Sequence, residues 1–182
     1  MLSPVALTML TGLALAAAVR GLGVHTAHLD WPNDVVVAGA KISGILVESR
    51  GLDANAPAYV VGVGLNVLQR EFSGELTEER RVTSLALEGS DADINRASEF
   101  VLAELAQKLE SVRDLFPTLG SDYLDETGLR DRHVNIQVGS QSLSGRLVDL
   151  NLTQGLCLEN ADGQRSNHAL EHVRSLSAQS PS

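Results

Sequence analysis

The alternation of apolar and polar positions predicts one buried helix followed by a series of short strands. Residues 4–20 are apolar almost all round, which is typical of a helix packed inside a protein. Ser3 is a favourable N-cap, Pro4 suits the first turn, and Gly21 favours the end of the helix. Runs rich in β-branched residues then predict strands at 24–29, 35–37, 41–49 and 59–65, with a polar loop at 50–57.

The pattern then changes to another helix and finally to small β-structure. Asp93 is a favourable N-cap for a helix that Pro117 ends. From His133 onward, short apolar runs alternate with turn glycines. We therefore expect an α+β chain with two domains, residues 1–128 and 129–182. Apolar residues recur along the second helix at steps of three and four, which predicts one packing face: Val101, Leu105, Leu109, Val112 and Phe116.

Composition agrees with a folded protein and argues against a nucleic-acid partner. The chain has 182 residues, of which 43% are apolar and 20% charged, a profile typical of globular proteins. Its formal net charge is −9, whereas a nucleic-acid-binding face needs clustered positive charge. The single cysteine excludes an intramolecular disulfide within these residues, and no cysteine cluster supports a structural metal. We expect no DNA partner and no structural metal.

The apolar segment near the start admits two interpretations. Its small residues Ala16, Ala17 and Ala18 are typical of the cleavage site of a secretory signal. No lysine or arginine precedes the segment, however, and Thr8 and Thr11 interrupt it. It is also shorter than the roughly 20 apolar residues that span a bilayer. We favour a buried core helix in a cytoplasmic protein that has no membrane partner.

The stretch from Asp30 to Asn66 carries the residues that are best suited to binding or catalysis. It opens with the letters DWPND, and Lys41 follows seven residues after the last of them, at the start of an apolar strand. Lysine is rare in this chain, because 14 basic residues include only Lys41 and Lys108 as lysines. A cation beside aliphatic residues and glycine is suited to holding an anion near a small pocket. The alternative is that Lys41 is simply the polar end of a hairpin strand.

Three motifs in this stretch resemble those of the biotin protein ligases. They are W-P-N-D, K-I-S-G-I-L-V-E and V-G-V-G-L-N, and their order and spacing match the second half of the family's catalytic domain. The resemblance extends from about Ser3 to the C-terminus. It implies an α+β fold, with a partial mixed β-sheet of the biotin/lipoate ligase type, packing helices and a small SH3-like β-barrel.

The resemblance also implies an activity and the residues that perform it. Such an enzyme uses ATP to join biotin to a lysine of a biotin carboxyl carrier protein through biotinyl-5′-AMP. Lys41 matches the family lysine that lies between the biotin carboxylate and the α-phosphate. A homodimer is a further expectation. The matching binding residues are Lys41, Gly44, Leu46 and Gly62 for biotin, and Asn33, Asp34 and Asn66 for ATP or its Mg²⁺. Trp31 either stacks on the adenine or packs inside the protein.

Two departures from the family pattern bear on activity. Asp30 stands where the family commonly has lysine, which replaces a cation with an anion near the nucleotide. The 182 residues also contain no Gly/Arg-rich loop of the kind that covers biotin and the adenylate. We therefore expect the first half of the catalytic domain to be missing and the chain to be a weak catalyst alone. Two alternatives stay open, a non-catalytic biotin-binding fragment and a relative of the lipoate ligases.

Overall fold

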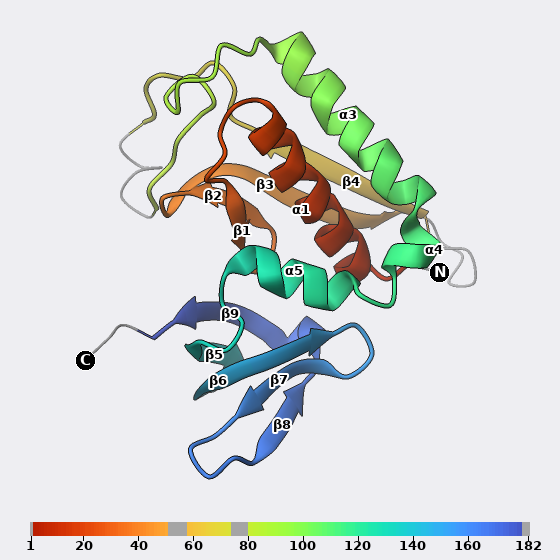
Figure 1. Ribbon diagram of the computed structural model, residues 1–182, viewed down its shortest axis with the longest axis vertical. Helices are drawn as coiled ribbons and strands as arrows, with labels where there is room; N and C mark the ends of the chain where they lie inside the picture. Colours follow the sequence, from red (N-terminus) through yellow and green to blue (C-terminus); the bar gives the residue numbers. More distant parts are fainter. Residues whose placement is uncertain (1, 51–57, 74–79, 180–182) are drawn as a thin grey trace.

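Two antiparallel sheets and the helices that pack on them form the structure (Figure 1). The computed structural model describes residues 2–50, 58–73 and 80–179, so most of the loop expected at 50–57 lies outside the described residues. This arrangement confirms the expected α+β class. The first sheet has the order β1-β2-β3-β4 and consists of β1 (His28–Asp30), β2 (Asp34–Val37), β3 (Ala40–Arg50) and β4 (Ala58–Leu65).

Helix α1 (Pro4–Gly21) is the buried helix that the apolar pattern predicts. The Ser3 side chain accepts a hydrogen bond from the Ala6 amide at 3.2 Å and so caps its N-terminus. By length and composition α1 would also suit a membrane span, but 61% of that window is buried inside the protein. The helix ends at Gly21 as expected, although Gly21 is not in the left-handed conformation. A Cβ there would lie 2.9 Å from the Phe100 ring, and the left-handed residue is Gly23, at φ 98°.

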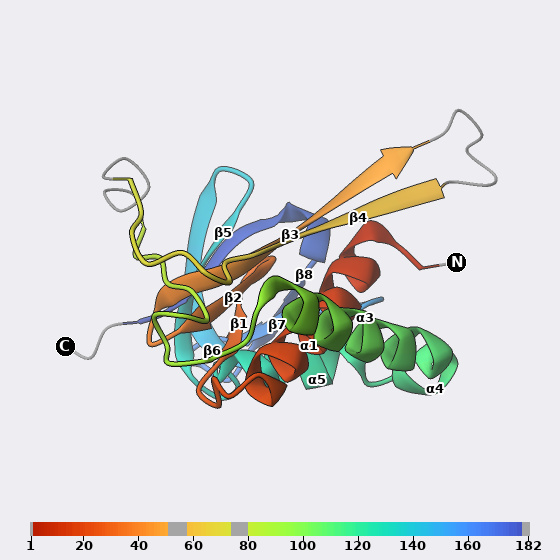
Figure 2. The same ribbon diagram turned by 90° about the horizontal axis from the view of Figure 1, so that it is seen from above.

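The hairpins of the first sheet differ in length from the prediction. The strand expected at 24–29 is only three residues long, because residues 24–27 form a turn closed by the Ala27 amide and the Val24 carbonyl. Ala38 and Gly39 join β2 to β3 with φ values of 48° and 76°, the positive angles that a two-residue hairpin requires. Strands β3 and β4 then pair over eight residues and extend together past the rest of the sheet (Figure 2).

The second predicted helix is present, but it ends before Pro117, where the apolar pattern predicted its end. It ends at Glu110, and the polypeptide continues as the separate turn α4. The expected packing face is only partly buried, since Leu109 and Phe116 keep 49% and 40% of their surface exposed. Ala97 is the one residue of the helix that is fully buried, where it packs beside α1. The elements of this region are α3 (Ile94–Glu110), α4 (Val112–Leu115) and α5 (Leu119–Thr127).

The second sheet follows α5 and has the order β8-β7-β6-β5-β9. It packs closely on the first part of the chain, since a Cβ at Gly120 of α5 would lie 2.3 Å from the Leu150 carbonyl oxygen. A further link is the hydrogen bond from the Trp31 indole N–H to the Val173 carbonyl, at 3.0 Å. Its strands are β5 (His133–Val138), β6 (Gln141–Asn151), β7 (Gly155–Glu159), β8 (Arg165–His168) and β9 (Val173–Ala178), with the 3₁₀ turn η1 (Leu170–His172) before β9.

Candidate active site

One face of the β3–β4 hairpin forms a shallow hollow. Residues that pair directly in an antiparallel ladder share a face, so the pairs Gly44–Gly64 and Leu46–Gly62 place four side-chain positions together. Helices α1 and α3 lie on the opposite side of these strands (Figure 2). The hollow has a volume of about 420 Å³, and Asn33 and Lys41 also line it. Leu46 is 61% exposed there, which is unusual for an aliphatic residue of a central strand.

The backbone of Lys41 is held from two sides. On one side Lys41 pairs with Val36 of β2, next to a register shift in that ladder. On the other side its amide donates to the Arg81 carbonyl and its carbonyl accepts from the Thr83 amide, both at 2.8 Å. These bonds make a parallel bridge between Lys41 and Val82, the one parallel pairing seen among the described residues. The segment after β4 therefore returns to lie beside Lys41.

Asp34 and Gly44 fix the ammonium group of Lys41. The Lys41 Nζ lies 2.7 Å from Asp34 Oδ1, and only 4% of the Asp34 side chain is exposed. This Oδ1 accepts no aligned hydrogen bond, so its partner is the Lys41 charge itself. A Cβ on Gly44 would lie 2.9 Å from Nζ and 3.1 Å from Oδ1. A Cβ at this position would therefore displace the ion pair, which lies directly against Gly44.

Arg80 is a further charged residue of the site that the sequence did not indicate. Its guanidinium donates one hydrogen bond to Asp34 and another to Asp30. The sequence alone suggests that Asp30 repels phosphate, but its carboxylate is paired with a cation. Arg80 comes 46 residues after Asp34, so no local pattern signals their contact.

A second hollow adjoins the first, and Ser43, Asn66 and Arg80 join Lys41 as polar side chains in its lining. It has a volume of about 310 Å³. Lys41 and Gly44 line both hollows, so the Lys41 side chain lies where they meet. The lining of the second hollow comprises Lys41, Ile42, Ser43, Gly44, Gly64, Asn66, Phe72, Arg80 and Val82.

The two asparagines of the predicted site donate side-chain hydrogen bonds to backbone carbonyls near it. The Asn33 side-chain amide donates to the Ile45 carbonyl at 2.7 Å, across the β2–β3 ladder. The Asn66 side-chain amide donates to the Thr83 carbonyl at 2.9 Å, which ties the end of β4 to the returning segment. With these two, all seven residues that the motifs singled out lie in or beside the two hollows.

Trp31 packs inside the protein, and it does not line either hollow. It is 7% exposed and meets the Tyr123 ring edge to face, with 6.1 Å between ring centroids. The Tyr123 hydroxyl donates to the Pro32 carbonyl at 2.9 Å. Burial raises the pKa of this hydroxyl well above its usual range, and the Asp30 and Asp34 carboxylates add to the rise. Of the two roles open for Trp31, the structure supports packing.

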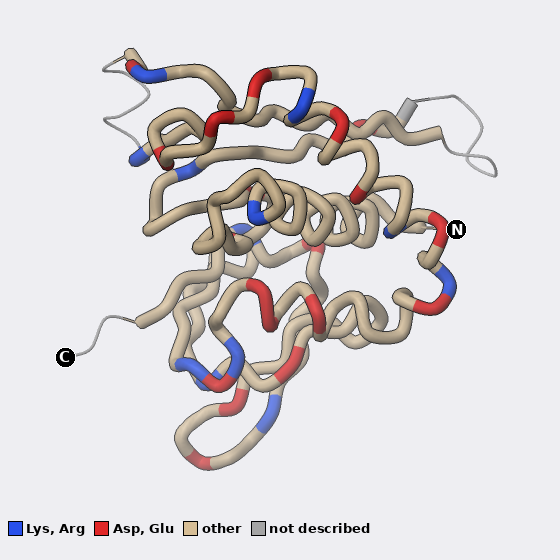
Figure 3. The backbone as a smooth tube through the Cα atoms, turned by 45° about the horizontal axis from the view of Figure 1, so that its top comes forward, with Lys and Arg blue, Asp and Glu red and all other residues tan. Residues whose placement is uncertain are grey.

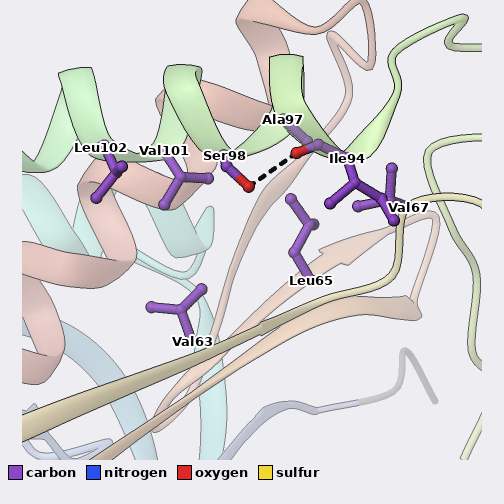
Figure 4. A pocket seen from close by; sticks show the side chains of 8 residues that line it. All are labelled: Val63, Leu65, Val67, Ile94, Ala97, Ser98, Val101 and Leu102. Atoms are coloured by element: carbon purple, nitrogen blue, oxygen red, sulfur yellow. Dashed lines mark hydrogen bonds between the residues drawn. The ribbon is translucent and has the colours of Figure 1, made fainter.

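A different groove lies on the helix side of β4 (Figure 4). Its volume is about 350 Å³, and its lining is almost wholly aliphatic. The one hydroxyl in it, that of Ser98, donates to the Ile94 carbonyl of the same helix at 2.8 Å. The groove therefore offers no charge to fix an anion. Its lining residues are Val63, Leu65, Val67, Ile94, Ala97, Ser98, Val101 and Leu102.

Known proteins resemble this chain in the segment that carries the site. Residues 2–66 match the model of the Biotin/lipoate A/B protein ligase family, and this range contains every site residue that the motifs predicted. A bifunctional ligase/repressor BirA from Salmonella typhimurium is 30% identical over 166 residues, which are 87% of this chain. The matched segment, residues 2–66, belongs to the biotin/lipoate protein ligase family, and the similarity to its members extends over most of the chain. The chain spans 49% of that relative, which is about half of its length.

Two further family members support the same assignment. A biotin–[acetyl-CoA-carboxylase] ligase from Mycobacterium tuberculosis is 32% identical over 157 residues, covering 84% of this chain and 56% of that protein. The structure of a biotin protein ligase from Aquifex aeolicus in complex with biotin and ATP superimposes with a TM-score of 0.76 at 25% identity. That superposition covers 96% of this chain and 72% of the Aquifex chain.

Proposed function

We propose that this family member attaches biotin to a lysine of a biotin carboxyl carrier protein, with ATP as the activating substrate. The observation that carries the proposal is the position of the Lys41 ammonium. It is held by Asp34 against Gly44, where the two hollows meet. A cation at such a junction suits a reaction that joins two anionic groups.

The proposed reaction has two steps through biotinyl-5′-AMP. The biotin carboxylate attacks the α-phosphate of ATP, and pyrophosphate leaves. Both reactants are negative, so a fixed cation between them lowers their repulsion in the transition state. Because Lys41 lines both hollows, its one ammonium can face the carboxylate and the phosphate together. The amine of the carrier lysine then attacks the acyl carbon of the mixed anhydride, and AMP leaves.

The two hollows suit the two substrates differently. We assign the glycine and aliphatic wall of Gly44, Leu46 and Gly62 to biotin, since its ring system is compact and its tail apolar. We assign the polar side to ATP, with Asn66 in the wall of the second hollow. Asn33 lines the first hollow, and it supports the site with Asp34 by holding β3 and the Lys41 ammonium in place.

Magnesium enters this proposal with the nucleotide. The two oxygens of Asp34 face Lys41 and Arg80, so they are not arranged to hold a resident divalent ion. Among the described residues no group of three or more His, Cys, Asp or Glu side chains is placed to bind a metal. Mg²⁺ prefers oxygen ligands and keeps several waters, which suits an ion carried on the phosphates of ATP. We therefore treat magnesium as part of the ATP substrate.

The names of the relatives favour biotin over lipoate as the acyl substrate. The Mycobacterium protein is named for acetyl-CoA carboxylase, and the Aquifex structure contains biotin and ATP. By extension we propose the carrier domain of an acetyl-CoA carboxylase as the acceptor. Charges of both signs are interspersed along the chain (Figure 3), and the expectation of no DNA partner stays a prediction. A homodimer and a domain division at Gly128, where α5 ends at φ 67°, are also still predictions.

One observation favours the non-catalytic alternative. Within the described residues the first hollow is bounded by one sheet face, and Leu46 is exposed there. An acyl-adenylate in an open site is subject to hydrolysis, because water is not excluded. We therefore expect the 182-residue chain to bind its substrates and to transfer biotin slowly.

The direct test is biotin transfer to a carrier domain. The chain is incubated with biotin, ATP, magnesium and a biotin carboxyl carrier domain, and the carrier is weighed by intact mass. Lys41→Ala is the test variant. Lys108→Ala is the matched control, because it removes the only other lysine and lies on α3 away from both hollows.

The expected result is slow, ATP-dependent biotinylation by the wild type and by Lys108→Ala, with none by Lys41→Ala. Equal transfer by Lys41→Ala would show that the ammonium is not part of the chemistry. No transfer by the wild type above the carrier-only background would favour the non-catalytic alternative. Fast, stoichiometric transfer would show that an open site is sufficient.

A further inference from the structure

The second cation of the site, Arg80, has no role in the function proposed above. It reaches the site from the segment after β4 and lines the second hollow together with Lys41, Gly44 and Asn66. Its guanidinium is fixed by two carboxylates from different strands, Asp30 of β1 and Asp34 of β2. An arginine side chain loses much rotational freedom when it is held in this way. Because its guanidinium is fixed and faces a hollow, Arg80 is better suited to binding a ligand than to keeping the surface soluble.

The residues that directly follow Arg80 are tied to Lys41 through the backbone. The carbonyl of the next residue, Arg81, accepts the Lys41 amide at 2.8 Å, and Val82 forms the parallel bridge with Lys41. The strand that carries Lys41 therefore holds the chain immediately after this arginine.

We propose that Arg80 is a phosphate-binding residue of this site, held in position by Asp30 and Asp34, which binds the phosphates of the nucleotide. This inference rests on the proposed function, because it assigns a further residue to the nucleotide side of the same site. A planar guanidinium with five N–H donors matches the oxygens of a phosphate better than a point charge does. Asp30 thus acts as a positioning residue for Arg80 and is not simply a repulsive charge.

Charge within the cluster supports this assignment. Asp30 and Asp34 carry two negative charges, and Lys41 and Arg80 carry two positive charges, so the four side chains sum to zero. If Arg80 were absent, a triphosphate would meet a cluster with a net charge of −1. Asp34 is buried, whereas 37% of the Arg80 side chain and 35% of the Lys41 side chain are exposed. Both cations are therefore more accessible to a ligand than Asp34, and Asp30, at 40% exposure, is paired with Arg80.

The test measures anion binding by the 182-residue chain and does not depend on catalysis. Inorganic pyrophosphate and ATP with magnesium are titrated by calorimetry at low and high salt. Arg80→Gln removes the charge, and Arg80→Lys keeps the charge without the planar fork. Arg81→Gln is the matched control, since it makes the same charge change in the neighbouring side chain, which is exposed and donates to the Ala38 carbonyl. Circular dichroism and the unfolding midpoint report whether each variant is folded.

The expected loss of affinity for both ligands is about tenfold for Arg80→Gln, from one charge-assisted contact. Arg80→Lys should recover part of that loss, and Arg81→Gln should stay within about twofold of the wild type because its charge is screened. Equal losses for Arg80→Gln and Arg81→Gln, or no binding of either ligand by the wild type, would overturn the proposal. If transfer to the carrier proceeds while these titrations fail, the role of Arg80 is wrong and the ligase function stands.

Discussion

Two clusters in this molecule each hold a carboxylate between two cations, and they differ in their surroundings. In the first sheet, Asp34 faces Lys41 and Arg80, and 4% of its side chain is exposed. In the second sheet, Glu159 accepts hydrogen bonds from Arg146 at 2.7 Å and from Arg165 at 2.9 Å, and 19% of its side chain is exposed.

The comparison shows that similar ion pairs serve different purposes. Glu159 lies directly across from Arg146 on β6 and from Arg165 on β8, so these charges mark the register of three strands. Exposed pairs of this kind contribute little to stability. Asp34 is buried beside a hollow and holds its lysine against a glycine. We infer that the first cluster presents a cation to a ligand, whereas the second aligns strands.

The largest expected effect is a difference in the free energy of unfolding between variants of Asp34 and of Glu159. Asp34→Asn should lower the free energy of unfolding by about 2 kcal/mol, because a buried charge-assisted contact is lost. The cost stays below the roughly 3–5 kcal/mol of a fully buried pair, since both cations remain partly hydrated. Glu159→Gln should leave the free energy of unfolding close to that of the wild type.

Urea unfolding followed by Trp31 fluorescence measures both variants. Similar losses for the two would contradict the distinction between the clusters. A loss for Glu159→Gln larger than that for Asp34→Asn would reverse it.

A pair of glycines next to the clusters sharpens the comparison. At Gly145 a Cβ would lie 2.8 Å from the Glu159 carbonyl oxygen, and backbone cannot easily move. Gly145→Ala should therefore lower the free energy of unfolding by about 1–2 kcal/mol without changing ligand affinity. At Gly44 a Cβ would meet the flexible end of Lys41 at 2.9 Å. Gly44→Ala should leave stability nearly unchanged and weaken binding of a non-hydrolysable biotinyl-adenylate analogue about tenfold.

Thermal unfolding measures the stability of both alanine variants, and calorimetric titration measures their affinity for the analogue. The account predicts that stability changes only at one glycine and affinity only at the other. If Gly44→Ala lost stability and kept its affinity, the ion pair beside it would be structural.

The smallest expected effect is the pH dependence of the surface cluster. The hydrogen bond from Arg146, followed by that from Arg165, holds the pKa of the Glu159 carboxyl below its usual value of 4.5. A lowered pKa means that the stabilisation is complete above pH 4.5 and is lost as the pH falls through the folded-state pKa. The unfolding midpoints of the wild type and Glu159→Gln should therefore converge between pH 7 and pH 3. A difference that widens toward low pH would contradict this sign.

Much of the site followed from the sequence, because its residues lie on consecutive strands. The pattern placed Lys41 and Gly44 on one predicted strand and Gly62 on the next, and the pairing of β3 with β4 then puts the two glycines on one face. Arg80 could not be found in this way. Its contacts with Asp30 and Asp34 span 50 and 46 residues, and they depend on how the segment after β4 returns to Lys41.

The fold was predictable where burial is uniform and less so where it is not. Most apolar residues of α1 are buried, and the exceptions Val5, Leu7 and Ala17 are partly buried, so the interpretation as a core helix is confirmed. The periodic face of the second helix predicted burial that Leu109 and Phe116 do not show. Periodicity reports which residues share a face, but it does not tell how much of that face another element covers.

The most direct test of the central claim is whether Lys41 joins the two hollows. Binding of the non-hydrolysable biotinyl-adenylate analogue, which has to occupy both, is measured by calorimetry with magnesium present. The account predicts that the wild type and Lys108→Ala bind it equally, and that Lys41→Ala binds about 100-fold more weakly, because contacts to both the acyl and the phosphate parts are lost. Equal binding by Lys41→Ala, or no binding by the wild type, would contradict the account.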